Sequence, residues 1–200
     1  MGIALTQMER GSALRRSSFI MALCVSATAA ATAYLNAGSV NGLVAGSTVT
    51  ITSQYTRQPT SLFVTPAHAG ITVVYRITGE NQFGDVIRED ISVAGTTAAH
   101  TLNCFRRITA LSIVSVTGGT LGAGTTISIG HSNAAGCRFP LWSRTIPAAA
   151  VKALVYAGNS PTVASSISVD TTRSCVVDAG AATVSTEAQV YLDPQYERYI

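Results

Sequence analysis

Three histidines are the first side chains to consider for catalysis or metal binding. His68, His100 and His131 lie 32 and 31 residues apart, and none belongs to a recognised His/Cys or His/carboxylate ligand motif. Such histidines are typical of structural or surface positions. Ser132 follows His131 in the segment GHSN, but a nucleophile elbow requires Gly-x-Ser-x-Gly and Ala134 takes the place of the second glycine. The histidines therefore indicate neither a metal centre nor a hydrolase.

Acidic side chains offer two further possibilities. The segment GENQFGD contains Glu80, Asn81 and Asp85, whose oxygen atoms are ligands that Ca²⁺ accepts. The segment lacks the D-x-D-x-D-G register of a calcium loop, and a plain hairpin loop explains the same residues. Glu89 and Asp90 are adjacent, and neighbours on a strand point to opposite faces. They cannot form the paired carboxylates of a glycosidase.

The glycine-rich and cysteine-containing segments are equally uninformative about chemistry. The run GGTLGAG at 118–124 has no following lysine, which argues against a phosphate-binding loop. Cys24, Cys104, Cys137 and Cys175 are far apart and form no CxxC pair. Disulfides and buried free thiols both remain open for them. We therefore predict no catalytic, cofactor-binding or metal-binding residues, no cofactor and no enzymatic activity.

The element that dominates the chain is a long β-hairpin at 71–96. Apolar side chains alternate with other residues along both arms, as expected for strands with one buried face. Matching the apolar faces predicts three cross-strand pairs and a loop at 80–84. The pairs are Ile77 with Ile87, Val73 with Ile91, and Ile71 with Val93.

The hairpin and the strand after it carry a resemblance to a known class of proteins. The residues that match are Tyr75, Ile77, Thr78, Gly79, Asn81, Gln82, Phe83, Gly84, Glu89, Ile91, Gly95, Phe105 and Ile108. This pattern resembles one that recurs in virion proteins of tailed bacteriophages, and the resemblance covers residues 70–130. It implies a β-sandwich that decorates or joins parts of the particle. None of the matched residues is a reactive group, so the resemblance speaks first to architecture.

Short alternating runs continue along the rest of the chain. They predict strands at 43–55, 61–65, 105–116, 125–129, 165–169, 174–177 and 182–192. The inward set of the strand at 105–116 changes parity between Ile113 and Val114, which predicts a bulge or a strand end there. Pro140 and Pro147 disfavour a continuous strand in the linker at 133–144 and beyond. The segment from Pro147 to Gly158 has the composition of a short helix.

The N-terminal segment 10–33 imitates an export signal. Arg15 and Arg16 precede an apolar stretch at 19–25, and small residues follow up to Ala33. The apolar stretch is short and is soon interrupted by Ser26 and Thr28. We therefore expect a retained arm, helical or extended, that a neighbouring structure must hold in place.

These observations predict a mainly β fold, either an antiparallel β-sandwich or a jelly-roll-like arrangement, with an extended or partly helical N-terminal arm. The expected organisation is an N-terminal arm at 1–36, a β-sandwich core domain at 37–135, and a C-terminal β-rich extension at 136–200. The extension ends in a tyrosine-rich tail that includes Tyr191, Tyr196 and Tyr199. Tyrosines on a tail suit contacts with another protein.

Composition indicates assembly with other subunits. Charged residues make up only 12% of the chain, against about 25% in ordinary domains. Neighbouring subunits would cover a surface with so few charges. The net charge of +3 is small and dispersed, so no nucleic-acid partner is indicated. No apolar run approaches the roughly 18 residues of a membrane-spanning segment.

Together with the resemblance, the sequence predicts a bacteriophage structural protein assembled in the host bacterial cytoplasm. It would act in many copies as a decoration, or cement, protein of the virion. Its expected partners are the major capsid protein or other head or connector proteins, and copies of itself, without nucleic acid or membrane. The alternative from the signal-like segment is an exported binding module, such as an adhesin or a pilus-like subunit.

Overall fold

The structure is a computed structural model that describes residues 20–24, 30–51, 54–131, 139–141, 151–157, 160–163, 168–178 and 187–192. All regular elements in these ranges are β-strands, which confirms the mainly β expectation. The strands are β1 (Ile20–Cys24), β2 (Ala30–Ser39), β3 (Thr48–Val49), β4 (Gln54–Thr60), β5 (Phe63–Glu80), β6 (Val86–Gly95), β7 (Ala99–His100), β8 (Phe105–Thr117), β9 (Thr126–His131), β10 (Phe139–Pro140), β11 (Val151–Ala157), β12 (Ser160–Val163), β13 (Ser168–Asp170), β14 (Cys175–Asp178) and β15 (Glu187–Leu192).

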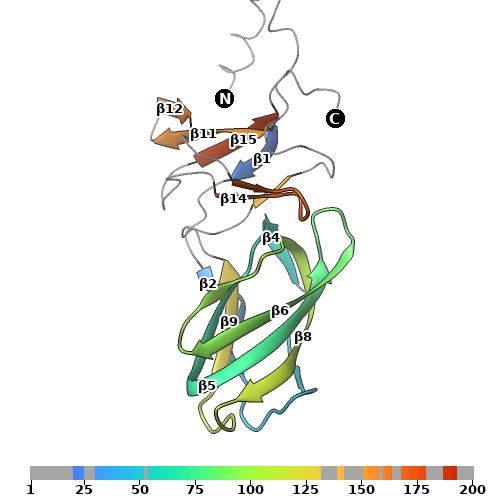
Figure 1. Ribbon diagram of the computed structural model, residues 1–200, viewed down its shortest axis with the longest axis vertical. Helices are drawn as coiled ribbons and strands as arrows, with labels where there is room; N and C mark the ends of the chain where they lie inside the picture. The colour runs from blue at the N-terminus through green and yellow to red at the C-terminus, as the bar shows by residue number, and fades with distance from the viewer. Residues whose placement is uncertain are drawn as a thin grey trace, which may run out of the picture.

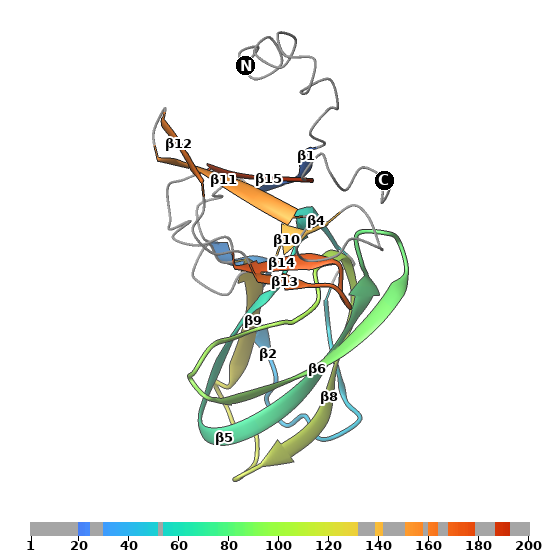
Figure 2. The ribbon, with the colours of Figure 1, turned by 45° about the horizontal axis from the view of Figure 1, so that its top comes forward.

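The strands form one large antiparallel sheet and two small ones. The large sheet has the order β2-β9-β5-β8-β3, with β4 also paired to β8, and with β6 and β7 also paired to β5. A three-stranded sheet has the order β10-β14-β13, and a four-stranded sheet has the order β1-β15-β11-β12. In both views the three-stranded sheet lies between the large sheet and the four-stranded one (Figures 1 and 2).

Strand β5 gives the large sheet its curl because its two halves have different neighbours. The first half pairs with β9 from Phe63 to Ala67, and the second half pairs with β6 and β8 from Thr72 to Glu80. Between the halves the β5–β6 register shifts, and Gly70 has a φ of +76°. A residue with a side chain rarely adopts this conformation, so Gly70 permits the bend. The result is a curled sheet in which one long strand connects both parts (Figure 1).

The hairpin at 71–96 exists, but its predicted register is wrong by two residues. Ile77 lies opposite Glu89 rather than Ile87, and Ile87 lies opposite Gly79. A shift of two residues preserves which side chains face the core, so the predicted apolar faces are confirmed. The ladder ends at the pair Glu80 and Val86, so the loop at 81–85 has the same length as the predicted loop at 80–84 and is shifted by one residue.

The other two predicted pairs shift in the same way. Val73 lies opposite Val93, and Tyr75 lies opposite Ile91. The predicted partners Ile71 and Val93 are therefore not paired. Apolar matching favoured the predicted register because the observed one has only two apolar pairs among these residues, Val73 with Val93 and Tyr75 with Ile91, and places Ile77 opposite Glu89.

Strand β8 contains the predicted irregularity. Val74 of β5 lies opposite Ser115, whereas the next residue, Tyr75, lies opposite Ile113. Val114 is therefore an extra residue in the β8 strand, which confirms the bulge predicted from the parity change. A second register shift leaves Thr109 as an extra residue, and the sequence pattern did not predict it.

Several predicted element bounds require correction. The predicted strand at 43–55 consists of turns near Gly42 and Gly46, the short β3, and the start of β4. The predicted strand at 61–65 is the beginning of the 18-residue β5. Pro66 does not end that strand, and it lies opposite Ile127 of β9 within the ladder.

The predicted helix between Pro147 and Gly158 is also wrong where the structure describes it. Residues Val151–Ala157 form β11, which pairs with both β12 and β15. Pairing on both sides outweighs the helix propensity of alanine because every backbone group of a central strand finds a partner. The predicted strands at 165–169, 174–177 and 182–192 correspond to β13, β14 and β15 in the described ranges.

The described part of the expected N-terminal arm is extended. β1 pairs with β15, and β2 pairs with β9 of the large sheet. β2 runs across the expected boundary between residues 36 and 37, and Tyr34 on it is buried. Residues 1–19 and 25–29 lie outside the described residues, as does the tail after Leu192.

One hydrophobic core fills the concave side of the large sheet. Its members come from β2, β3, β5, β6, β8 and β9 and from the loops beside them. They are Tyr34, Val40, Val49, Leu62, Val64, Val73, Tyr75, Ile77, Ile91, Val93, Phe105, Ile108, Leu111, Ile113, Leu121, Ile127 and Ile129. Each fully buried side chain of this kind stabilises the fold by about 1.5–3 kcal/mol relative to exposure.

Candidate functional site

The tip of the β5–β6 hairpin is organised by Asn81. Its side-chain oxygen accepts hydrogen bonds from the backbone N–H groups of Phe83 and Asp85, both at 2.9 Å. Its backbone N–H donates to the carbonyl oxygen of Asp85, and Gly84 N–H donates to the carbonyl oxygen of Asn81. Gly84 has a φ of +87°. These features match a three-residue hairpin loop that ends in a glycine bulge.

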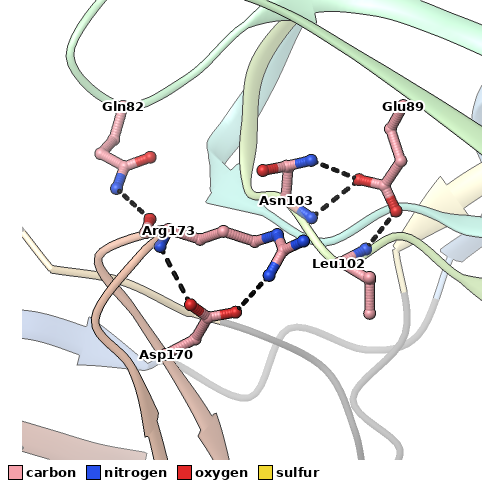
Figure 3. A network of polar contacts seen from close by, with 6 residues as sticks. All are labelled: Gln82, Glu89, Leu102, Asn103, Asp170 and Arg173. Carbon is pink, nitrogen blue, oxygen red and sulfur yellow. Dashed lines mark hydrogen bonds and ion pairs between the residues drawn. The ribbon is translucent and has the colours of Figure 1, made fainter.

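The next residue, Gln82, joins the hairpin tip to the C-terminal part of the chain. Its side chain is 4% exposed, and its amide nitrogen donates to the carbonyl oxygen of Ser174 at 3.0 Å. The carbonyl oxygens of Leu141 and Arg173 lie 3.4 Å from the same nitrogen. Figure 3 shows the Gln82 side chain directed at the turn that carries Arg173. Gln82 therefore connects the hairpin to the turn between β13 and β14.

Glu89 fixes a second loop at the same end of the sheet. Its carboxylate accepts hydrogen bonds from the backbone N–H of Leu102 and Asn103 and from the side-chain amide of Asn103. The two bonds from Asn103 measure 2.8 and 2.7 Å (Figure 3). Hydrogen bonds to a charged acceptor are stronger than those between neutral groups. Glu89 thus holds the loop between β7 and β8 against β6.

Arg173 and Asp170 complete this group of polar residues. The guanidinium of Arg173 pairs with the carboxylate of Asp170 at 2.7 Å, and the backbone N–H of Arg173 donates to the same carboxylate at 3.0 Å. The hydrogen bond to Asp170 raises the pKa of Arg173, and the charge of Glu89 adds to the effect. Within the turn these contacts fix the backbone that Gln82 binds (Figure 3).

A small pocket lies between these three segments. Its volume is about 210 Å³, and Asn81, Gln82, Phe83, Ile87, Asn103, Cys104, Thr172, Arg173 and Ser174 line it. Typical ligand pockets have volumes of about 300–1,000 Å³ and mainly apolar linings. Most polar groups here hold the hairpin tip, the loop and the turn together. We define these three segments and their contacts as the hairpin-tip joint.

The three histidines occupy separate places in the large sheet. His68 is buried on β5, where its Nδ1 lies 3.1 Å from the carbonyl oxygen of Ile71 and donates to it. His100 lies against the ring of Phe63, with centroids 4.8 Å apart, and burial lowers the pKa of its imidazole. His131 lies near the hydroxyl of Tyr34, at 3.3 Å. The described structure does not bring the three histidines together.

Four buried side-chain atoms have no hydrogen-bond partner in the described part of the chain, namely Oγ1 of Thr65, Nε2 of His68, the hydroxyl oxygen of Tyr75 and Nδ1 of His100. The rings of His68 and Tyr75 lie 6.2 Å apart. Burial raises the pKa of the Tyr75 hydroxyl, which is therefore protonated at neutral pH. The described contacts place neither Nε2 of His68 nor the Tyr75 hydroxyl beside a nucleophile or a carboxylate in a catalytic arrangement.

The oxygen atoms considered for calcium serve other contacts. Glu80 pairs with Arg107 at 3.2 Å, and the side-chain amide of Asn81 donates to the carboxylate of Asp85 at 3.0 Å. Glu89 and Asp90 point to different partners, because Asp90 forms a bidentate pair with Arg76. Within the described residues no group of three His, Cys, Asp or Glu side chains is placed to hold a metal ion.

The cysteines are described in part. Cys104 and Cys175 are buried and free of disulfides. Cys24 lies on β1, and Cys137 and Ser132 lie outside the described residues. The segment at 118–124 connects β8 to β9. Nothing in its described contacts resembles a phosphate site.

Sequence reasoning missed the role of Gln82, Glu89 and Arg173. One signal was present, because Glu89 interrupts the apolar face of β6 and an acidic residue at such a position requires a partner. Gln82 offered no comparable signal, since its acceptors are backbone carbonyls 59 to 92 residues away.

Comparisons with protein-family models, with curated proteins and with solved structures found no match. Among the described residues no helix is long and apolar enough to cross a membrane. The contacts of the hairpin-tip joint connect three parts of the chain that are distant in sequence.

Proposed function

We propose that the chain is a structural protein of a tailed-bacteriophage particle. In this proposal it binds the capsid shell or a neighbouring head or connector part, as a multi-copy decoration protein assembled in the host cytoplasm. The observation that carries the proposal is the set of contacts made by residues that match the phage pattern. Asn81, Gln82 and Glu89 all bind backbone groups of the chain itself. Such a hairpin serves architecture rather than chemistry.

In this proposal, the chain stabilises the particle by burying surface between neighbouring subunits. Charged residues form only 12% of the chain. Among the described residues, four large apolar side chains are exposed, including Val86 at 71% and Val44 at 65%. Apolar area contributes about 25 cal/mol per Å² when it is removed from water. Contacts of modest area hold a shell when symmetry repeats them. In this proposal, the large sheet forms one part of a β-sandwich in the particle.

The second candidate is an exported binding module. It rests on one observation, the signal-like sequence in which Arg15 and Arg16 precede an apolar stretch and small residues. An intact mass of the protein from its natural source separates the two proposals. A mature chain that begins near Ala33 supports export, and a chain that retains the segment before Ala33 supports assembly in the cytoplasm.

Reconstitution tests the first proposal. Particles from a genome that lacks this chain are mixed with the purified chain and separated on a density gradient. We expect saturable binding with a copy number fixed by the particle's symmetry, in the hundreds for a shell position and about a dozen for a connector position. Absence of saturable binding to such particles contradicts the proposal.

A further inference from the structure

One exposed aromatic side chain lies outside the hairpin-tip joint. Tyr55 on β4 is 60% exposed, although tyrosine is a large residue and its ring is mainly apolar. β4 pairs with β8 alone in the described sheet, so it is an edge strand. The exposed part of the Tyr55 ring is therefore accessible to a partner.

Two arginines of β8 lie beside the Tyr55 ring. The guanidinium carbon of Arg107 is 5.1 Å from the ring centroid, and that of Arg106 is 5.8 Å from it. Both distances fall within the range of cation–π attraction, which extends to about 6 Å. The two cations therefore restrict the ring before any partner binds.

Backbone contacts fix the position of the aromatic residue as well. Tyr55 lies opposite Arg107 in the β4–β8 ladder. The buried hydroxyl of the next residue, Thr56, lies within hydrogen-bond distance of two carbonyl oxygens of β8, at 2.8 Å from Phe105 and 3.1 Å from Arg106. A side chain on such a fixed element loses little entropy on binding. We call Tyr55, Arg106 and Arg107 the tyrosine–arginine surface.

The two arginines of this surface differ in whether a carboxylate pairs with them. Arg107 pairs with Glu80 at 3.2 Å. Arg106 is exposed, and no carboxylate of the described residues pairs with it. The surface therefore presents one arginine whose guanidinium is available for a new contact, next to a fixed aromatic ring. Tyrosine and arginine are also the residue types that contribute most to protein–protein binding energies.

We propose that the tyrosine–arginine surface binds a carboxylate-bearing segment of a partner protein. The guanidinium of Arg106 would donate two parallel hydrogen bonds to the carboxylate of an aspartate or glutamate, and the Tyr55 ring would cover the neighbouring apolar atoms. Nucleic acid fits less well, because its affinity depends on several phosphate contacts and Glu80 adds a negative charge beside Arg107. For its biological setting this inference rests on the proposed function in assembly.

The test uses the full chain and two synthetic peptides. One peptide contains alternating Glu and Leu between neutral caps, and the other has Gln in place of each Glu. Calorimetric titration should detect the acidic peptide and not the Gln peptide. Affinity should fall about tenfold in Arg106→Glu, which corresponds to about 1.4 kcal/mol. Tyr55→Ala should also weaken binding severalfold. Raising the salt concentration should weaken binding by the intact chain.

Arg88→Glu is the matched control. Arg88 is also exposed, and it lies on β6, on the far side of β5 from β8. The substitution changes the net charge by the same amount as Arg106→Glu. It should change the affinity less than twofold. Equal loss in both variants would mean diffuse electrostatic attraction, and this outcome overturns the proposed surface.

Two further outcomes overturn the inference. One is that the chain does not bind the acidic peptide. The other is that the chain binds a thymidine oligonucleotide more tightly than the acidic peptide, and that Arg106→Glu abolishes this binding. These failures are separate from failure of the proposed function. A chain that binds particles saturably but not the acidic peptide retains the proposed function and loses this surface. A chain that binds the peptide through Arg106 but no particle retains the surface and loses the function.

Discussion

The side-chain amide of Gln82 donates to the carbonyl oxygen of Ser174 at 3.0 Å, although 92 residues separate the two in sequence. This hydrogen bond links the tip of the β5–β6 hairpin to the turn before β14. Figure 3 shows the contact of the same amide with the carbonyl oxygen of the preceding residue, Arg173. Its acceptor belongs to the backbone, so the contact depends on the position of the turn and not on the identity of its side chains. The hairpin tip therefore sets where the β13–β14 turn lies.

We expect Gln82→Leu to loosen this turn. Leucine has a similar volume but no donor, so the Ser174 carbonyl oxygen keeps only the hydrogen bond that it accepts from the backbone N–H of Leu141. Loss of one such hydrogen bond costs about 0.5–1.5 kcal/mol. Hydrogen exchange should become faster at 170–175, with little change in the centre of β5. Ser92→Ala removes an exposed hydroxyl from β6 that has no hydrogen-bond partner among the described residues, and it is the control. Unchanged exchange at 170–175 in Gln82→Leu would refute the role of this bond.

Gly79→Ala should be strongly destabilising. A Cβ at this position would overlap the carbonyl oxygen of Arg107 and lie 2.8 Å from the ring of Phe105. Because the obstacle is backbone within the β5–β8 ladder, the strands must separate. We expect the free energy of unfolding to fall by about 3 kcal/mol or more, measured by chemical denaturation.

Gly122→Ala is the matched control for that experiment. A Cβ at Gly122 meets no atom within 4 Å, and the backbone there has no positive φ. Its effect on stability should stay within about 0.5 kcal/mol. Similar stability of the two variants would show that β5 and β8 do not approach each other as closely as described.

The alternation of the hairpin arms, and hence their buried faces, could be predicted because period-two patterns depend only on local sequence. The parity change at Val114 was predictable for the same reason. The register was not, because a shift of two residues keeps the same faces buried and the choice depends on Asn81. Its side chain satisfies two backbone N–H groups of a short loop, which no apolar pattern encodes.

Longer-range pairing explains the remaining differences. β11 was predicted as a helix from its alanines, but its neighbours β12 and β15 supply partners for its backbone on both sides. Strand β5 was predicted in two pieces, a strand at 61–65 and the first arm of the hairpin from Ile71, whereas Pro66 and Gly70 lie within one strand. Here the proline lies within the ladder to β9 and the glycine forms the bend. The Gln82 contacts of the hairpin-tip joint could not be predicted, since their acceptors are backbone carbonyls.

Glu89→Gln tests the second loop contact. The carboxylate accepts three N–H groups of Leu102 and Asn103, whereas an amide would turn its own donor toward one of them. Hydrogen bonds to a charged group contribute about 1.5–3 kcal/mol. We expect the free energy of unfolding to fall by an amount of this size, and hydrogen exchange to become faster at Leu102 and Asn103.

Asp90→Asn is the neighbouring comparison for Glu89→Gln. Asp90 pairs with Arg76, but both side chains are more than two-fifths exposed. Solvent screens such a pair, so its loss should change stability much less than Glu89→Gln. The reverse order of effects would contradict the importance assigned to Glu89.

Stability should decrease as the pH falls below about 6.5 because of His100. Burial lowers the pKa of its imidazole in the folded state below the ordinary value of 6.5. The unfolded chain therefore binds a proton first, and the contribution of neutral His100 is present above that value and is lost below it. His100→Phe retains a ring against Phe63 and should reduce the difference in unfolding free energy between pH 7.5 and 5.5. An identical pH dependence in both proteins would contradict this account.

If the chain is a structural part of a phage particle, as we propose, it is present in purified particles at a fixed copy number. Particles produced from the genome that encodes the chain are purified on two successive gradients, and the chain is quantified by mass spectrometry against the major capsid protein. We expect a constant ratio that corresponds to a symmetric number of copies per particle. A chain that is absent from the particles, or whose ratio to the capsid protein falls with each gradient, is not a structural part of them.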